Sequence, residues 1–201
     1  MTDPLPELLA ELEQFGREND RTVTDYGRRM LNITRDTGEM LNVLVRALGA
    51  RRVLEVGTSN GYSTLWLAQA AHALGGQVTT VDRSDYKIAL AAANFRRAGL
   101  DCGITQVRAD AGAFLATAPT AGFDLVFLDS QRSEYPAWWP ELKRVLRPGG
   151  LLVADNALSH QVDMAPFVAL VQADPAMTAC TVPVGNGEFL ATRAALPPGA
   201  L

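Results

Sequence analysis

Residues 53–68, VLEVGTSNGYSTLWLA, decide the fold because they pass from an apolar run through a loop with two glycines into a helical pattern. A short apolar run that ends at a glycine is typical of a strand buried on both faces. Four similar runs follow, and the five are RVLEV, QVTTVD, GITQVRAD, FDLVFLD and GLLVADN. Helical stretches begin between them near Gly61, Ser84, Ala111 and Glu134. This alternation predicts an α/β fold with a doubly wound, mostly parallel sheet and helices on both faces.

The two ends of the chain follow other patterns. Apolar residues at helical spacing predict an amphipathic helix over roughly the first fifteen residues, namely Leu5, Leu8, Leu9, Leu12 and Phe15. A second helix is expected from an N-cap at Asp36, paired with Glu39, to Gly49. The segment TACTVPVGNGEFLATR predicts a C-terminal antiparallel hairpin, with PPGAL fraying after it. We therefore expect one domain over residues 1–201, with 1–50 as a helical lid or dimer segment and 51–201 as the core.

The composition limits the partners of the chain. It has 201 residues, 48% hydrophobic content and a formal net charge of −4. Without a basic stripe, binding to nucleic acid or to an anionic membrane is not expected, and a small molecule is the expected partner. The acidic start and the lack of a long apolar run predict a cytoplasmic protein. Cys102 and Cys180 are expected to be reduced and buried, because no metal-ligand or disulfide pattern includes them.

The glycine loop does not match the known phosphate-binding patterns. A dinucleotide fingerprint requires G-x-G-x-x-G, whereas Gly57 and Gly61 are four residues apart with Ser59 between them. Glu55 at the strand end would repel a pyrophosphate, and no Gly-Lys-Ser/Thr follows that would form a P-loop. A ligand is still expected there, because open α/β sheets bind ligands at the carboxyl ends of their strands.

Acids at successive strand ends suit a ligand that combines an ammonium group with a nucleoside. Glu55 can pair with an ammonium, directly or through water. Asp82 can accept hydrogen bonds from ribose hydroxyls, and Asp110 from an adenine amino group. These three parts without phosphate add up to S-adenosylmethionine. The alternative is that the glycines only make a tight turn and Asp82 only caps a helix.

Four segments, LEVGTSNGYST, TTVD, FDLVFLD and VADN, carry a family resemblance. The chain resembles the class I S-adenosylmethionine-dependent methyltransferases with a Rossmann-like core, and more narrowly the cation-dependent O-methyltransferases related to catechol O-methyltransferase. The similarity extends from LNITRDTG to GNGEFLATR. It implies a homodimer and a divalent cation held by Asp129, Asp155 and Asn156. The cofactor contacts that it implies are Asn32, Ile33, Glu55, Gly57, Ser59, Ser63, Asp82, Asp110 and Asp129.

The chemistry of the three implied ligands supports a cation. Asp129 ends the fourth strand, and Asp155 and Asn156 end the fifth. If these strands are neighbours, their ends lie about 5 Å apart. Hard oxygen donors favour Mg²⁺, with Mn²⁺ or Ca²⁺ as alternatives. Such an ion would lower the pKa of an acceptor hydroxyl and position its oxygen. The alternative is that Asp129 is a helix cap and that Asp155 and Asn156 form an ordinary turn.

The segment DSQRSEY departs from the family pattern. Arg132 stands where the family commonly has a lysine that serves as base, and a guanidinium does not lose its proton in proteins. Arg132 is expected to stabilise an anionic oxygen, to orient a carboxylate-bearing substrate, or simply to pair with Glu134. His160 and Asn186 are further polar candidates for the acceptor pocket, although a solvated loop histidine is the simpler interpretation of His160.

These observations predict an S-adenosylmethionine-dependent O-methyltransferase that acts on a hydroxyl of a small, catechol-like aromatic substrate. A divalent metal is expected to assist, and Asp129 and Arg132 are the predicted catalytic residues. The alternatives are a metal-independent methyltransferase, or a protein that binds S-adenosylmethionine without turnover and acts through its dimer surface. An NAD-dependent oxidoreductase is disfavoured by the incomplete glycine fingerprint.

Overall fold

The computed structural model describes residues 4–195, which form one seven-stranded sheet in the order β3-β2-β1-β4-β5-β7-β6. Five strands are parallel: β1 (Arg52–Val56), β2 (Gln77–Asp82), β3 (Ile104–Arg108), β4 (Phe123–Leu128) and β5 (Leu146–Ala154). The last two, β6 (Met177–Val182) and β7 (Glu188–Arg193), form an antiparallel hairpin whose β7 also pairs with β5. The predicted α/β fold and its C-terminal hairpin are confirmed.

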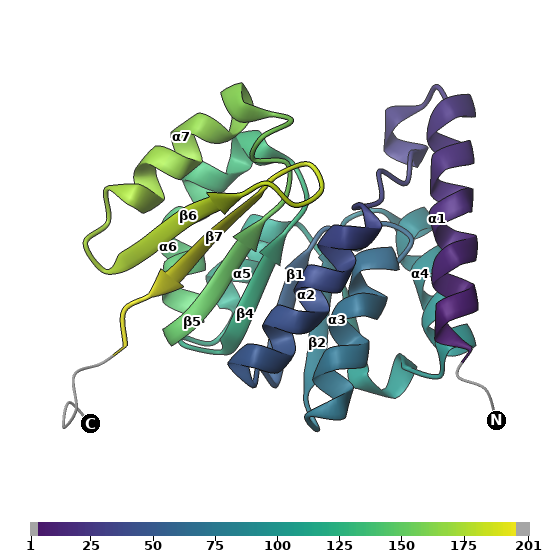
Figure 1. Cartoon of the computed structure of the whole chain (residues 1–201), viewed down its shortest axis with the longest axis horizontal. Coiled ribbons are helices and arrows are strands. Elements are labelled where there is room, and N and C mark those ends of the chain that lie inside the picture. Colours follow the sequence, from purple (N-terminus) through teal and green to yellow (C-terminus); the bar gives the residue numbers. More distant parts are fainter. Residues whose placement is uncertain (1–3, 196–201) are drawn as a thin grey trace.

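Within residues 4–195, seven α-helices cover both faces of the sheet (Figure 1). They are α1 (Leu5–Thr22), α2 (Arg35–Leu48), α3 (Tyr62–Ala73), α4 (Asp85–Ala98), α5 (Ala111–Thr117), α6 (Tyr135–Val145) and α7 (Gln161–Gln172). Three short 3₁₀ helices, η1 (Tyr26–Arg28), η2 (Asp101–Gly103) and η3 (Arg132–Glu134), lie in the connections. Figure 1 shows α1 on the opposite side of the molecule from the β6–β7 hairpin, packed against α3 and α4.

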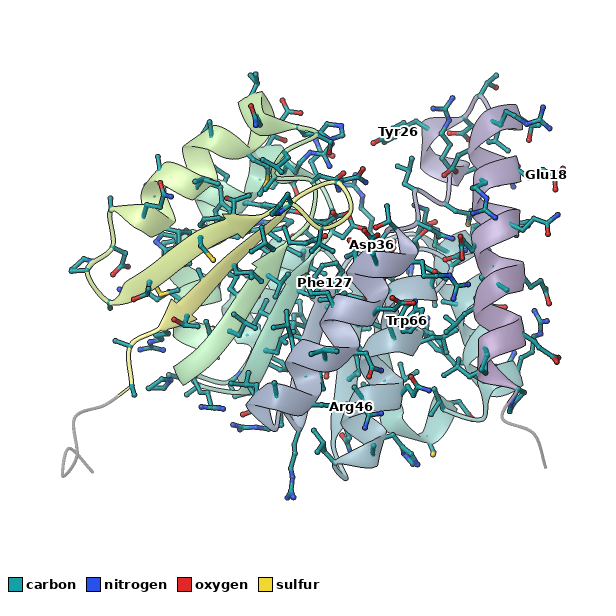
Figure 2. The ribbon with its side chains drawn as sticks, viewed as in Figure 1. Glu18, Tyr26, Asp36, Arg46, Trp66 and Phe127 are labelled. Atoms are coloured by element: carbon teal, nitrogen blue, oxygen red, sulfur yellow. The ribbon has the colours of Figure 1, made fainter. Side chains whose placement is uncertain are left out.

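The strands divide their side chains between two hydrophobic clusters. Leu125 and Phe127 of β4 point to the face covered by α1 to α4, where Phe127 and Trp66 of α3 share one cluster (Figure 2). Val126 and Leu128, the alternate residues of the same strand, join the cluster under α5, α6 and α7. Period-2 alternation in a strand buried on both faces accounts for this division.

The N-terminal helices differ from the predicted ones at their ends. Helix α1 continues to Thr22, and Phe15 is 40% exposed, so the apolar stripe that faces the core consists of the four leucines alone. Thr34 is the N-cap of α2 and accepts a hydrogen bond from the Thr37 amide, so the prediction that Asp36 is the N-cap was wrong by two residues. Gly49 ends the helix in the left-handed conformation, as predicted.

Two further predictions were wrong. Residues 161–172 form α7, which the sequence analysis did not expect because Pro166 and apolar residues around the whole helix obscure its periodicity. Cys102 and Cys180 are exposed rather than buried, although both are free thiols. The PPGAL segment lies outside the described residues. None of the helices between residues 4 and 195 is long and apolar enough to cross a membrane.

Candidate functional site

A cavity of about 680 Å³ opens at the carboxyl ends of the parallel strands, beside the point where the strand order reverses between β1 and β4. It contains many of the predicted site residues: Asn32, Gly57, Ser59, Asp82, Asp129, Arg132, Asp155, Asn156, His160 and Asn186 all line it. This is the location that an open α/β sheet provides for a ligand.

The glycine loop forms one wall of the cavity and approaches β4 closely. Gly57 has a φ of +109°, and a Cβ atom there would lie 2.0 Å from the Asp129 carbonyl oxygen. The Ser59 amide donates to Asp82 Oδ2 at 3.1 Å, and the Ser59 hydroxyl donates to the Met30 carbonyl at 2.6 Å. The loop therefore connects the end of β2 to the segment between α1 and α2.

Glu55 lies behind this wall and does not line the cavity. Its fully buried carboxylate accepts hydrogen bonds from the hydroxyls of Ser63 (2.6 Å), Thr80 (2.6 Å) and Thr64. Burial raises the pKa of Glu55 to about 7, although the three hydroxyls oppose that rise. The geometry gives Glu55 and Ser63 a role in holding β1, β2 and α3 together beneath the loop. Ammonium binding by Glu55 stays a prediction.

The other predicted cofactor residues differ in their access to the cavity. Asn32 donates to the Leu12 carbonyl at 3.0 Å, and its buried Oδ1 has no hydrogen-bond partner among the described residues. Ile33 is buried in the hydrophobic core and is absent from the cavity wall. Asp110 is exposed and caps α5 by accepting from the Ala113 amide at 3.0 Å, while its neighbours Ala109 and Ala111 line the cavity.

Three predicted ligands lie close together in the cavity wall, namely Asp129, Asp155 and Asn156. They are brought together because β4 and β5 are neighbours, as predicted. The side-chain amide of Asn156 donates from Nδ2 to Asp155 Oδ2 at 2.8 Å and to Asp129 Oδ1 at 3.4 Å. Asn156 adopts a left-handed φ of +71°, which asparagine tolerates better than most residues. Burial, followed by the neighbouring Asp155, raises the pKa of Asp129 well above its ordinary value, and burial also raises that of Asp155.

The donor set at this centre is two carboxylates and one amide. Within residues 4–195, no three His, Cys, Asp or Glu side chains are grouped in a way that could hold a metal ion. Carboxylate and amide oxygens are in general ligands of hard cations, so a divalent cation at these residues stays a prediction.

Glu188 is a buried acid that the sequence analysis missed. It begins β7, is fully buried, and accepts a hydrogen bond from the Thr37 hydroxyl at 2.8 Å. Burial and the nearby Asp155 raise the pKa of Glu188 to about 9. The signal that could have revealed it is a glutamate directly after Gly187, at the start of a strand whose next residues are apolar.

Arg132 lies in η3 and lines the cavity, with a side chain that is 18% exposed. Its nearest carboxylate is Asp163, with 3.9 Å between Nε and Oδ2, and no ion pair with Glu134 occurs among the described residues. His160 also lines the cavity, and its Nδ1 lies 2.9 Å from the Ser159 hydroxyl. Both residues therefore face the space where a methyl acceptor is expected.

Comparisons with known proteins agree with this geometry. A family model described as O-methyltransferase matches residues 3–194. The chain is 32% identical over 143 residues to the catechol O-methyltransferase of Niastella koreensis, an alignment that covers 68% of this chain and 63% of that protein. The chain thus spans less than two thirds of the length of that relative.

Two solved structures are similar over most of the chain. The O-methyltransferase from Bacillus cereus in complex with SAH has a TM-score of 0.78 and 26% identity, covering 93% of this chain and 90% of that one. TomG from Streptomyces achromogenes, an O-methyltransferase involved in tomaymycin synthesis and solved with SAM, has a TM-score of 0.78 and 28% identity, covering 94% and 90%.

Proposed function

This chain belongs to the O-methyltransferase family of class I S-adenosylmethionine-dependent proteins, and we propose that it transfers a methyl group from S-adenosylmethionine to a hydroxyl of a small, catechol-like aromatic acceptor. The observation that carries the proposal is the convergence of Asp129, Asp155 and Asn156 beside a glycine loop in one cavity. The cavity volume of about 680 Å³ is in the range of small-molecule and cofactor sites.

The methyl donor would lie against the glycine loop. Asp82 accepts two backbone hydrogen bonds, from Ser59 and Ser84, and its carboxylate has further lone pairs for ribose hydroxyls. Asn32 offers an unpartnered acceptor oxygen at the cavity wall, which suits the ammonium of the amino-acid part. The absence of a Cβ at Gly57 keeps the loop close to Asp129, so that donor and acceptor sites adjoin.

The residues at the centre fit a divalent cation of the magnesium type. Asp129, Asp155 and the side-chain amide oxygen of Asn156 would hold it, and among the described residues no arginine or lysine donates a hydrogen bond to either carboxylate. When bound, such a cation lowers the pKa of the acceptor hydroxyl and fixes its oxygen. By holding such a cation, the two carboxylates and the amide would position the acceptor for attack on the methyl group, and position is the main requirement for this transfer.

In the transfer, the acceptor oxygen bonds to the methyl carbon, the carbon–sulfur bond breaks, and the hydroxyl proton leaves. Arg132 cannot take that proton, because a guanidinium remains protonated. His160 lines the cavity and is exposed to solvent, and an imidazole can accept a proton and release it to water. We assign this proton transfer to His160.

Calorimetry and a methylation assay test this function. We expect the protein to bind S-adenosylmethionine and S-adenosylhomocysteine, and to methylate catechol in a reaction that EDTA stops and Mg²⁺ restores. Binding of a nicotinamide dinucleotide in place of S-adenosylmethionine would refute the function. Activity unchanged by EDTA and by Asp155→Ala would place the protein among metal-independent methyltransferases.

A second function has one observation in its favour. Arg132 at the position of the usual base is compatible with a protein that binds S-adenosylmethionine but does not turn over, and that acts through its surface as a dimer. A screen of hydroxylated aromatics with the methyl donor separates the two functions, because firm cofactor binding without any turnover would favour the binding protein.

The remaining expectations belong to the same proposal. We infer a cytoplasmic homodimer of single-domain subunits, in which residues 1–50 form the lid or dimer segment and residues 51–201 form the core. Sedimentation velocity of the full chain tests the dimer, and a monomer across micromolar concentrations would remove it from the proposal.

A further inference from the structure

Arg132 carries a charge that the rest of the described protein does not neutralise well. Its side chain is mostly buried, and its Nε atom has no hydrogen-bond partner among residues 4–195. The distance of 3.9 Å to Asp163 is too long for a hydrogen bond. Asp163 is also 58% exposed, so water screens the attraction between the two charges.

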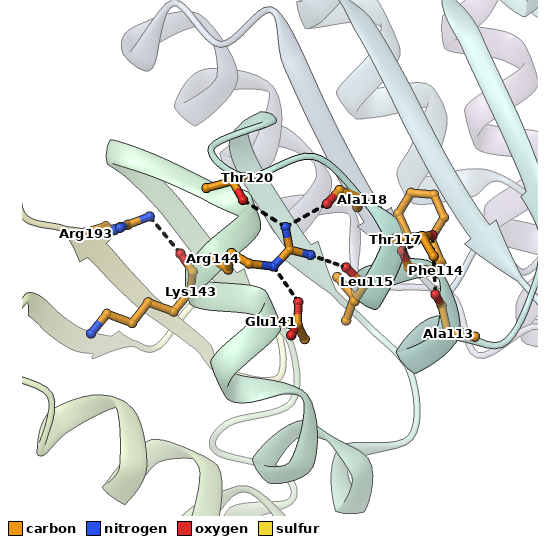
Figure 3. A network of polar contacts seen from close by, with 10 residues as sticks. All are labelled: Ala113, Phe114, Leu115, Thr117, Ala118, Thr120, Glu141, Lys143, Arg144 and Arg193. Carbon is orange, nitrogen blue, oxygen red and sulfur yellow. Dashed lines mark hydrogen bonds and ion pairs between the residues drawn. The ribbon is translucent and has the colours of Figure 1, made fainter. Parts of the chain in front are cut away.

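Arg144 provides a comparison, because every nitrogen of its guanidinium donates a hydrogen bond. Arg144 of α6 donates from Nε to Glu141 at 2.6 Å, and from its two terminal nitrogens to the carbonyls of Ala118 and Leu115, both at 2.7 Å (Figure 3). Arg144 is a structural residue that joins α6 to the end of α5. Arg132 has no comparable network, although it is held in a short helix at the wall of the cavity.

The acids that face Arg132 have another role in the proposed function, on which this inference rests. Arg132 acts electrostatically on Asp129 and Asp155, where it opposes the rise of their pKa. If both carboxylates hold a cation, they no longer serve as partners for the guanidinium. The Ser130 hydroxyl, which lines the same cavity, is also buried without a partner among the described residues.

We propose that Arg132 recognises a carboxylate on the methyl acceptor, so that the preferred substrate is a hydroxylated aromatic acid rather than a neutral catechol. A guanidinium presents two parallel N–H donors that match the two oxygens of a carboxylate, whereas a lysine ammonium binds as a point charge. A buried charge requires such a partner, and the bound acid supplies it. Arg132 is in this view a specificity-determining residue and not the base of the reaction.

The test compares acids with their neutral amides in the presence of S-adenosylhomocysteine and Mg²⁺. The probes are 2,3- and 3,4-dihydroxybenzoate and the two corresponding benzamides, with affinity measured by calorimetry and turnover measured with S-adenosylmethionine. We expect at least one acid to bind about 10- to 100-fold more tightly than its amide, as a hydrogen-bonded ion pair would give. Arg132→Gln should remove this preference, mainly through KM, and Arg132→Lys should retain part of it.

Arg96→Gln is the matched control, since Arg96 is an exposed residue of α4 and the substitution makes the same change of charge. It should leave the preference unchanged. Equal affinity of the wild type for the acids and amides, or an equal loss for both in Arg132→Gln, would overturn the inference and indicate a role at the reacting oxygen or in folding. Failure of the proposed function would differ, because the wild type would then not bind S-adenosylhomocysteine.

Discussion

An aspartate lies at each end of strand β4, and the two differ in their hydrogen bonds and in the direction of their pKa shifts. Asp124, at the amino end, accepts hydrogen bonds from the amides of Arg51 (2.9 Å) and Arg52 (2.8 Å) and from Arg147 Nε (2.7 Å). Burial raises the pKa of Asp124, but these donors outweigh it and the net pKa is lowered. Asp129, after the carboxyl end, receives one hydrogen bond at 3.4 Å, and its pKa is raised.

This difference separates a structural carboxylate from one that we propose binds a ligand. Asp124 joins the starts of β1, β4 and β5 and contributes to stability. Asp129 and Asp155 are close together, and among the described residues no arginine or lysine donates a hydrogen bond to them, an arrangement that costs stability and is typical of functional sites. Substitutions at the two ends should therefore separate stability from activity.

The largest effect is expected at the carboxyl end, on activity. Asp155→Asn should lower kcat/KM for methyl transfer by at least about 10³-fold, because it removes one of the two anionic ligands of the proposed cation. The free energy of unfolding should remain unchanged or increase, since the substitution removes a buried charge that forms no ion pair among the described residues. A methylation assay measures kcat/KM, and urea unfolding measures the free energy of unfolding. The control is Asp101→Asn, which makes the same change at an exposed residue of η2. A fully active Asp155→Asn would contradict the role of Asp155 as a ligand of the proposed cation.

The next effect is expected at the amino end, on stability. Asp124→Ala should lower the free energy of unfolding by about 3 kcal/mol, because it leaves Arg147 and two backbone amides without their acceptor. The affinity of the folded variant for S-adenosylhomocysteine should stay within a few-fold of the wild type. Thermal unfolding and calorimetry give the two values, and a variant that is stable but does not bind would reverse the assignment of the two ends.

A smaller effect depends on pH. The pKa of Glu188 is about 9 in the folded protein and 4.5 ordinarily, so the unfolded chain ionises first as the pH rises. The contribution of Glu188 to stability should therefore be full below pH 4.5 and decline up to about pH 9. Glu188→Gln stays neutral and can still accept from Thr37, so it should match the wild type at low pH and exceed its free energy of unfolding at pH 8.

The check is urea unfolding of both proteins in EDTA across this pH range. Asp124 predicts the opposite direction: its lowered pKa stabilises the protein above its ordinary value of 3.8, and that contribution is lost as the pH falls further. Curves for wild type and Glu188→Gln that stay parallel at every pH would show that Glu188 is ionised in the folded protein.

The smallest effect is expected at Asp110, which lies at the carboxyl end of β3 but has a structural partner. Asp110→Ala should cost about 1 kcal/mol of stability through loss of the N-cap of α5, and Asp110→Asn only a few tenths. We expect the affinity for S-adenosylmethionine to fall several-fold in the alanine variant. A large loss of affinity in Asp110→Asn, with stability retained, would instead show that the carboxylate itself binds the adenine.

The sequence was most informative where local periodicity and buried strands coincide. The five parallel strands, the glycine loop and the adjacency of Asp129 to Asp155 follow from runs such as FDLVFLD and GLLVADN, whose burial on both faces leaves few alternatives. Helix α7 was missed because its periodicity is weak and Pro166 lies inside it. Ends of helices were less certain, as the shift of the α2 cap from Asp36 to Thr34 shows.

Side-chain partners that are distant in sequence could not be predicted. Glu55 has an acid's charge and a strand-end position, but only the packing of Ser63, Thr64 and Thr80 around it reveals that its oxygens are already bonded. Glu188 lies near Asp155 because the β6–β7 hairpin returns beside β5. The exposure of Cys102 and Cys180 likewise depends on the neighbours that cover them, and residue type alone gives only a tendency.

The hydrogen bond between Thr37 and Glu188 joins residues that are 151 positions apart, and the amide of Gly185 donates to Asp36 beside it. Strand β5, which ends at Asp155, obtains its second neighbour only when β7 is present. During synthesis, the glycine loop and its first strands leave the ribosome long before this closure is available. The acidic centre is therefore the last part of the cavity to be completed. A nascent chain that lacks β7 contains the wall proposed for the methyl donor without the finished site proposed for the acceptor.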